Sequence, residues 1–134
     1  MTMKNTLLQP EGWVTPKGYA NGIVATGTRW LFIAGQVGWN AHQEFETDDF
    51  VGQVEQALRN VVGVLAAAEA SPEAIVRMTW YVTDRAAYLS SLKEIGRVYR
   101  ATIGRHFPAM TAVEVAALVE DGALVEIEVT AVLP

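Results

Sequence analysis

Val125-Glu126-Ile127-Glu128-Val129-Thr130-Ala131, close to the end of the chain, is the stretch that decides the fold class. Its odd positions are apolar, whereas its even positions carry two carboxylates and a hydroxyl group. Successive side chains of a β-strand point to opposite faces, so this alternation predicts a strand with Glu126, Glu128 and Thr130 on one face. The apolar face of such a strand must be covered by a second layer of structure.

The rest of the chain predicts the other elements. Further strands are expected at 5–8, 19–26, 30–36, 74–83 and 111–118, and the last strand spans 124–133. Apolar residues at helical spacing predict one helix over 50–69, after Asp48-Asp49, and a second between the N-cap residue Asp84 and Ile103. Two hairpins are expected, one joining 19–26 to 30–36 through 27–29, the other joining 111–118 to 124–133 through 120–122.

The resulting order, β-β-β-α-β-α-β-β, predicts an α+β fold in which two helices cover one face of a sheet. Trp30-Leu31-Phe32-Ile33-Ala34 is apolar at every position, so both faces of that strand should be covered. A second copy of the chain is the simplest cover for the other face, which predicts a homo-oligomer. The alternative is that scattered exposed apolar residues are ordinary.

Composition narrows the class of protein. The 134 residues suit a single domain, 1–134, and a chain that is 51% hydrophobic and 19% charged is not disordered. The net charge of −5, with no run of basic residues, argues against nucleic acid as a partner. No apolar run is long enough to span a membrane, and Met1–Pro10 lacks a signal-peptide pattern, so we expect a cytoplasmic protein.

Residue types also limit the chemistry. The chain has no cysteine, so disulfides, thiolate catalysis and zinc–thiolate sites are excluded. No phosphate-binding loop, histidine pair at metal spacing or nucleophile elbow occurs, so we expect neither a cofactor nor a metal. His106, beside Arg105 and Phe107, is a candidate base, although an isolated histidine in a loop is more often exposed and without function.

The carboxylates of the last strand are the strongest candidates for chemistry. Glu126 and Glu128 share a face, and Glu114 lies in an apolar run before them. A carboxylate partly shielded from water by a second subunit can exchange a proton with a bound water. The alternative is a solvent-exposed face, or a pairing with a basic neighbour such as Arg77, and the charge pattern alone favours this alternative.

Five segments together resemble the RidA/YjgF family, in the same order and over essentially the whole chain. Phe107-Pro108-Ala109-Met110-Thr111-Ala112-Val113-Glu114-Val115-Ala116 is the strongest of them. The others are Gly18-Tyr19, Phe32-Ile33-Ala34-Gly35-Gln36, Trp80-Tyr81-Val82-Thr83-Asp84 and Val125-Glu126-Ile127-Glu128.

The resemblance implies a chorismate-mutase-like fold and a homotrimer with three small-molecule clefts between subunits. Members of the family hydrolyse reactive enamines and imines, such as 2-aminoacrylate, to a ketoacid and ammonia without a cofactor. By this resemblance Glu126 positions the attacking water, and Tyr19 and Gly35 line the pocket. We assign the remaining ligand-binding positions to Ala34, Gln36, Trp39, Met110, Thr111 and Ala112.

One departure from the family pattern changes the expected substrate. The arginine that binds the substrate carboxylate is replaced by Met110, and small apolar residues stand at three positions that are usually polar, which are Ala34, Ala86 and Ala112. A thioether offers neither charge nor a strong donor. We therefore expect a hydrolase or deaminase acting on a larger, less anionic enamine, imine or related electrophile. The alternative is a non-catalytic, small-molecule-binding or chaperone-like trimer.

Overall fold

The structure is a computed structural model that describes residues 5–134. Its strands are β1 (Asn5–Leu8), β2 (Gly22–Ala25), β3 (Arg29–Val37), β4 (Ile75–Val82), β5 (Ala109–Glu114) and β6 (Val125–Leu133). Its helices are α1 (Phe50–Ala67), the short 3-10 helix η1 (Pro72–Ala74), α2 (Arg85–Ser90) and α3 (Leu92–Thr102). The order of the elements agrees with the sequence-based prediction, except that the second predicted helix is divided into α2 and α3.

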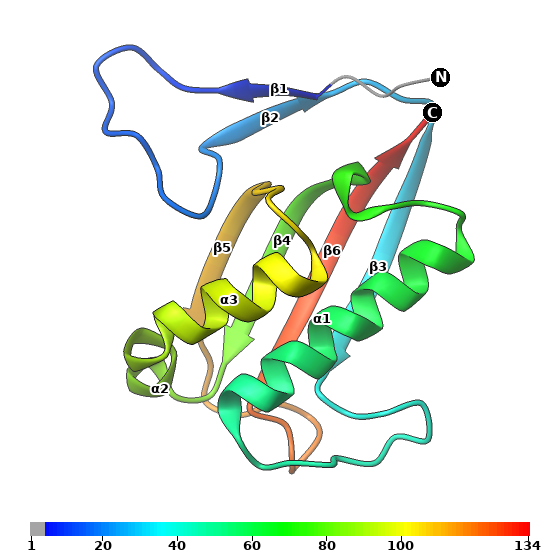
Figure 1. Ribbon diagram of the computed structural model, residues 1–134, viewed down its shortest axis with the longest axis vertical. Helices are drawn as coiled ribbons and strands as arrows, with labels where there is room; N and C mark the ends of the chain where they lie inside the picture. Colours follow the sequence, from blue (N-terminus) through cyan, green and yellow to red (C-terminus); the bar gives the residue numbers. More distant parts are fainter. Residues whose placement is uncertain (1–4) are drawn as a thin grey trace.

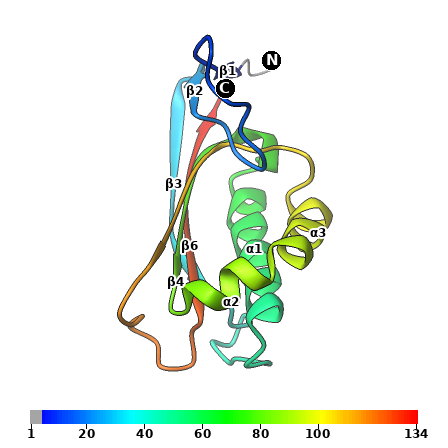
Figure 2. The same cartoon turned by 90° about the vertical axis from the view of Figure 1, so that its left-hand side faces the viewer.

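Four strands form the main sheet in the order β3-β6-β4-β5 (Figure 1). β6 runs antiparallel to both of its neighbours, whereas β4 and β5 are parallel and are joined through α2 and α3. The edge-on view shows the helices on one side of this sheet only (Figure 2). The predicted α+β class, with helices on one face, is confirmed, and the opposite face of the sheet is uncovered within one chain.

The core lies between that sheet and the helices. Val125, Ile127, Val129 and Ala131 of β6 are buried in it, so the apolar face predicted for this strand is confirmed. α1 contributes a buried stripe at helical spacing, formed by Val54, Ala57, Leu58, Val61 and Leu65. Each fully buried large apolar side chain stabilises the fold by about 1.5–3 kcal/mol.

Both predicted hairpins are wrong. β2 pairs with β1 in a separate two-stranded sheet, and β3 pairs with β6 instead of β2. The amide of Thr28 donates to the carbonyl of Leu133 (2.9 Å), which turns the chain toward β6 at the point where the hairpin was expected. β6 lies between β3 and β4, and residues 115–124 are long enough to carry the chain past β4.

Several predicted boundaries also need correction. The strand expected at 19–26 is only Gly22–Ala25, and the one expected at 111–118 is Ala109–Glu114. The second helix is interrupted at Ser91, whose amide closes the last turn of α2 by donating to Tyr88. In β4, the pairing with β6 is irregular between Ile75 and Arg77, so Ile75 is buried in the core whereas Val76 is only half-buried.

Two predicted helix caps are confirmed by hydrogen bonds. Asp49 Oδ2 accepts from the amide of Gly52 (2.8 Å) at the start of α1. Asp84 Oδ1 accepts from the amides of Ala86 (2.9 Å) and Ala87 (3.3 Å) at the start of α2. Such caps stabilise a protein by about 0.5–2 kcal/mol each.

Tyr99 makes the stability of this fold sensitive to alkaline pH. Its ring is buried and its hydroxyl donates to the carbonyl of His106 (2.6 Å), and burial raises its pKa well above the ordinary value. As the pH rises, the unfolded chain therefore loses this proton at a lower pH than the folded chain does. The free energy of unfolding is retained below about pH 10 and falls as the pH rises further. Burial also raises the pKa of Tyr88, which contributes in the same direction.

We expect the free energy of unfolding of Tyr99→Phe to fall less steeply with rising pH than that of the wild type, because phenylalanine has no proton to lose. At neutral pH the variant should be less stable by about 0.5–1.5 kcal/mol, the usual loss for one hydrogen bond. Urea unfolding measured between about pH 8 and pH 11 checks both effects. Equal slopes above pH 10 for the two proteins would contradict the assignment to Tyr99.

Candidate functional site

The three candidate carboxylates have different surroundings. Glu128 is exposed and accepts a hydrogen bond from the Tyr81 hydroxyl (3.3 Å). Its negative charge is the main reason why the pKa of Tyr81 is raised. Glu114 accepts from the amide of Arg85 (2.8 Å) and so supports the start of α2. Glu126 is half-buried, and its carboxylate has no hydrogen bond or ion pair with any other residue in 5–134.

Gly35 leaves room for the Glu126 side chain. The pairing of β3 with β6 is irregular between Ile33 and Gln36, and Gly35 lies in this bulge. A Cβ atom at Gly35 would overlap the carboxylate of Glu126 and lie 2.7 Å from its Cδ. The carboxylate therefore lies directly over bare backbone, an arrangement that only glycine permits here. The structure thus brings together two of the residues assigned from the sequence.

Tyr19 and Met110 meet at another place, which we call the aromatic cavity. This cavity has a volume of about 300 Å³ and lies between α2, α3, the loop before β2 and the strands β4 and β5. It is lined by Lys17, Gly18, Tyr19, Trp80, Tyr88, Leu92, Ile95, Gly96, Tyr99, Phe107 and Met110. Met110 is half-buried and pairs with Met78 across the two parallel strands.

The remaining assigned residues lie elsewhere. Gln36 and Trp39 line a cavity of about 430 Å³ beside α1, and Trp39 packs against Phe45 with ring centroids 5.7 Å apart. Ala34 is exposed on β3, and Thr111 and Ala112 are exposed on β5. Within one chain, therefore, Met110, Ala34, Ala112 and Trp39 do not line a common cavity.

Glu126 and Met110 lie on opposite faces of the sheet. Glu126 alternates with the core residues of β6, so its side chain is on the uncovered face. Met110 packs against the core and lines a cavity beneath the helices. No single chain can bring these two side chains to one small molecule.

The uncovered face carries a large apolar surface, which we call the outer patch. Trp30 is 66% exposed and Phe32 is 70% exposed, and their rings lie 6.0 Å apart. They border a cavity of about 470 Å³ that is also lined by Ile23, Ala25, Gly27, Val76, Arg77, Ala109, Thr130 and Val132. Apolar surfaces of this kind on a soluble protein mark places where another molecule binds.

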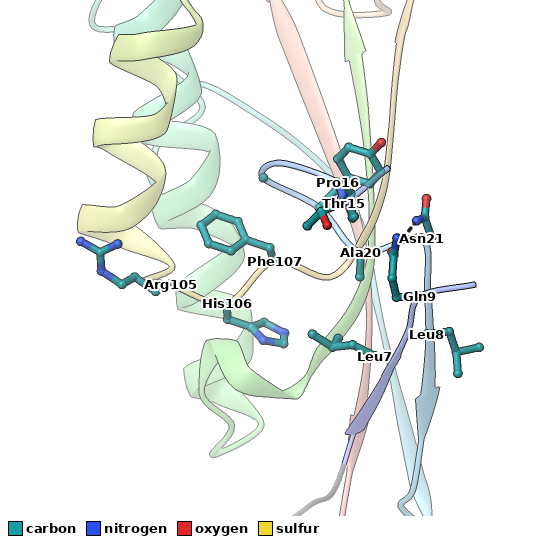
Figure 3. A pocket seen from close by; sticks show the side chains of 12 residues that line it. Leu7, Leu8, Gln9, Thr15, Pro16, Ala20, Asn21, Arg105, His106 and Phe107 are labelled. Carbon is teal, nitrogen blue, oxygen red and sulfur yellow. Dashed lines mark hydrogen bonds between the residues drawn. The ribbon is translucent and has the colours of Figure 1, made fainter. Parts of the chain in front are cut away.

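His106 has a structural role. Its ring Nε2 lies 2.7 Å from the carbonyl oxygen of Ile75, so this nitrogen carries the proton and donates to the end of η1 and the start of β4. Arg105 is exposed nearby. Both line a fourth cavity, about 350 Å³, whose lining also includes Phe107, Leu7 of β1, and Thr15 and Pro16 of the following loop (Figure 3).

Residues 5–134 contain neither a cluster of metal-binding side chains nor a membrane-spanning helix. No group of three or more His, Asp or Glu side chains is arranged there to hold a metal ion. In the same part of the chain, no helix is both long enough and apolar enough to cross a membrane.

Comparison with known proteins gives matches over most of the chain. The family model described as Endoribonuclease L-PSP matches residues 14–133. A RutC family protein from Leuconostoc mesenteroides subsp. cremoris is 34% identical over 118 residues, which are 84% of this chain and 85% of that protein. A solved structure from the conserved Rid protein family of Yersinia pestis matches with a TM-score of 0.85 and 32% identity, over 96% of this chain and 98% of the other. This chain belongs to the RidA/YjgF family.

A second solved structure broadens the comparison within the RidA/YjgF family. A Mycobacterium tuberculosis protein, described as a member of the highly conserved YjgF family, is 31% identical and has a TM-score of 0.63, over 97% of this chain and the whole of the other. The match of these structures along nearly the full length confirms the fold expected from the resemblance.

The sequence analysis missed most of the aromatic cavity of this RidA/YjgF chain. None of Trp80, Tyr88, Tyr99 and Phe107 is among the ligand-binding positions assigned from the sequence, yet all four line the cavity. Three of the four tyrosines line this cavity together with Met110. The concentration of aromatic residues between residues 80 and 110 was the available signal, but core packing explains such a pattern equally well.

Proposed function

We propose that this protein is a Rid-like hydrolase or deaminase that acts on an enamine, imine or related electrophile without a small anchored carboxylate. Its site lies between subunits of a homotrimer. Glu126 of one subunit positions the attacking water, and the aromatic cavity of the next subunit receives the substrate. The observation that carries the proposal is the position of Glu126, which is half-buried over Gly35 and has no protein partner in residues 5–134.

The surroundings of the three carboxylates favour Glu126 for this role. Glu114 and Glu128 already accept hydrogen bonds from protein donors. A half-buried carboxylate without a partner is unfavourable for stability, so its retention suggests a task. With a water molecule beside it, Glu126 can accept the proton as the water attacks the imine carbon, and can return a proton to the leaving nitrogen.

Two features support a site between subunits. Glu126 and Met110 lie on opposite faces of the sheet, so a second copy is needed to bring one of each together. The outer patch, with Trp30 and Phe32 exposed, provides an apolar surface for that second copy. A homotrimer closes the contact into a ring, in which every copy uses the same two surfaces.

The family description names an endoribonuclease, which is a different activity. RNA binding depends on neutralising phosphate charge with clustered basic residues. This chain has a net charge of −5, and the face that bears Glu126 also bears Glu128. These charges favour a small, weakly charged substrate over RNA. The other candidate, a trimer that binds a small molecule without catalysis, has the same cavity and differs in the role of Glu126.

A hydrolysis screen tests the proposal. Imines and enamines with apolar or aromatic substituents are generated in solution, and release of ammonia or a carbonyl product is followed with and without protein. If the protein accelerates hydrolysis and this acceleration depends on Glu126, the result supports the hydrolase. If the protein binds these compounds but accelerates the hydrolysis of none of them, the result supports the non-catalytic trimer instead.

We expect the protein to have the mass of a trimer in solution, because burial of the outer patch stabilises the contact between copies. Light scattering coupled to size-exclusion chromatography at micromolar concentration measures this mass. Trp30→Glu should shift the mass toward the monomer, because it places a charge in the centre of the apolar contact. Val119→Glu, in a loop residue that is 94% exposed, serves as the matched control. A monomeric wild type would refute the shared site.

A further inference from the structure

The geometry of the aromatic cavity points to a substrate class. We propose that this cavity binds a planar, single-ring compound whose hydrogen-bond acceptor, such as a carbonyl oxygen, is held by the indole N–H of Trp80. This inference rests on the proposed function, because it names the chemistry of the substrate that the site between subunits receives.

The first observation is the unused donor of Trp80. This side chain is only 2% exposed and lies in the core, and its Nε1 has no hydrogen-bond partner within residues 5–134. An unsatisfied buried donor is unfavourable for stability, so native proteins rarely leave one without a purpose. Trp80 also lines the aromatic cavity, and we assign its missing acceptor to a molecule bound there.

The second observation is the shape and chemistry of the walls. Trp80 and Tyr88 meet edge to face with ring centroids 6.3 Å apart, and Tyr99 and Phe107 stack 5.4 Å apart at an interplanar angle of 13°. Aromatic walls in these orientations offer both ring faces and ring edges to a flat guest. Met110 adds a polarisable sulfur, which packs well against aromatic rings.

The third observation concerns size and charge. A volume of about 300 Å³ lies at the small end of ligand sites, and a dry cavity of half that size admits benzene. The cavity is therefore large enough for one ring with short substituents. Lys17 is the only charged residue in its lining, and it is exposed. An uncharged guest, or one whose negative charge points outward to Lys17, fits this distribution.

Two probes that differ only in the acceptor test the proposal. Acetophenone has a ring and a carbonyl oxygen, and α-methylstyrene has the same planar framework without the oxygen. The whole protein, labelled with ¹⁵N, is titrated with each probe, and the indole N–H signals of its four tryptophans are followed by NMR. Acetophenone should shift the Trp80 signal saturably, because a new hydrogen bond changes the shielding of its proton, whereas α-methylstyrene should shift it much less.

Trp80→Phe supplies the second readout, because it removes the donor and keeps an aromatic ring. It should weaken acetophenone binding by about three- to tenfold, the value of one neutral hydrogen bond, and change α-methylstyrene binding by less than about twofold. Altered packing would weaken the binding of both probes alike, so the difference between the two losses reports the hydrogen bond alone. Trp13→Phe, at an exposed tryptophan outside this cavity, should change neither. If Trp80→Phe does not fold, the wild-type titration alone decides.

Several results would overturn the inference. These are equal weakening of both probes, a Trp80 signal that does not respond to acetophenone, or the absence of acetophenone binding at millimolar concentration. Glu126→Gln should bind both probes as the wild type does. A protein that binds acetophenone through Trp80 but hydrolyses nothing would refute the proposed catalysis and leave this binding site standing.

Discussion

Glu126→Gln is expected to abolish most of any hydrolytic activity that the screen finds, while the fold and the assembly remain intact. Glutamine keeps the shape of the side chain over Gly35 but cannot accept a proton from the attacking water. The loss of a general base typically reduces the rate on the order of 10²- to 10⁴-fold. Turnover should fall, with little change in binding, because the substrate is held mainly by the aromatic cavity. Single-turnover kinetics on the best substrate separate the two effects.

Two neighbouring carboxylates provide matched controls for that experiment. Glu128→Gln changes the same chemical group on the same face of β6, yet it affects a residue that already accepts from Tyr81. Glu114→Gln alters the carboxylate that supports the start of α2. Both should retain turnover within a few-fold of the wild type. Full activity in Glu126→Gln, or its loss in one of the controls instead, would assign the water-activating role to a different residue.

The local parts of the fold could be predicted from the sequence because local patterns determine them. Period-two alternation identified the buried face of β6, and side-chain oxygens at Asp49 and Asp84 fixed the starts of α1 and α2. Strand pairing could not be predicted in the same way. β6 pairs with β3, nearly a hundred residues earlier, and nothing in the turn at 27–29 indicates that this distant partner replaces β2.

Candidate site residues could be proposed one by one from the sequence, but their arrangement could not. Tyr19, Gly35, Met110 and Glu126 came from motif positions, yet the sequence does not indicate that Met110 and Glu126 lie on opposite faces of the sheet. A shift of one residue in strand register exchanges the faces, so only the pairing of β5 with β4 and of β6 with its neighbours decides this. The unpartnered indole of Trp80 likewise depends on which atoms surround it in three dimensions.

Met110 leads to the second large effect. We expect the wild-type protein to be very poor at hydrolysing imines produced from simple amino acids by an amino-acid oxidase. Those substrates are small and carry a carboxylate, so most of their binding energy must come from that charge. One charge-assisted hydrogen bond contributes about 1.5–3 kcal/mol, which corresponds to roughly one to two orders of magnitude in catalytic efficiency. The lining of the aromatic cavity offers only the exposed Lys17 in place of an arginine.

Met110→Arg should recover part of that activity, because a guanidinium can bind a carboxylate through two parallel hydrogen bonds. The recovery should be incomplete, since the surrounding walls are aromatic and apolar and leave the new charge short of partners. For the same reason the variant should bind acetophenone and other apolar ring compounds more weakly than the wild type. Val119→Arg adds the same positive charge at an exposed loop position and so controls for the effect of charge alone.

The assay times the disappearance of the imine against its hydrolysis in free solution, and thermal unfolding confirms that each variant is folded. Wild-type rates equal to those of a relative that has the arginine would show that Met110 does not determine the substrate, because the carboxylate would then be bound by other groups.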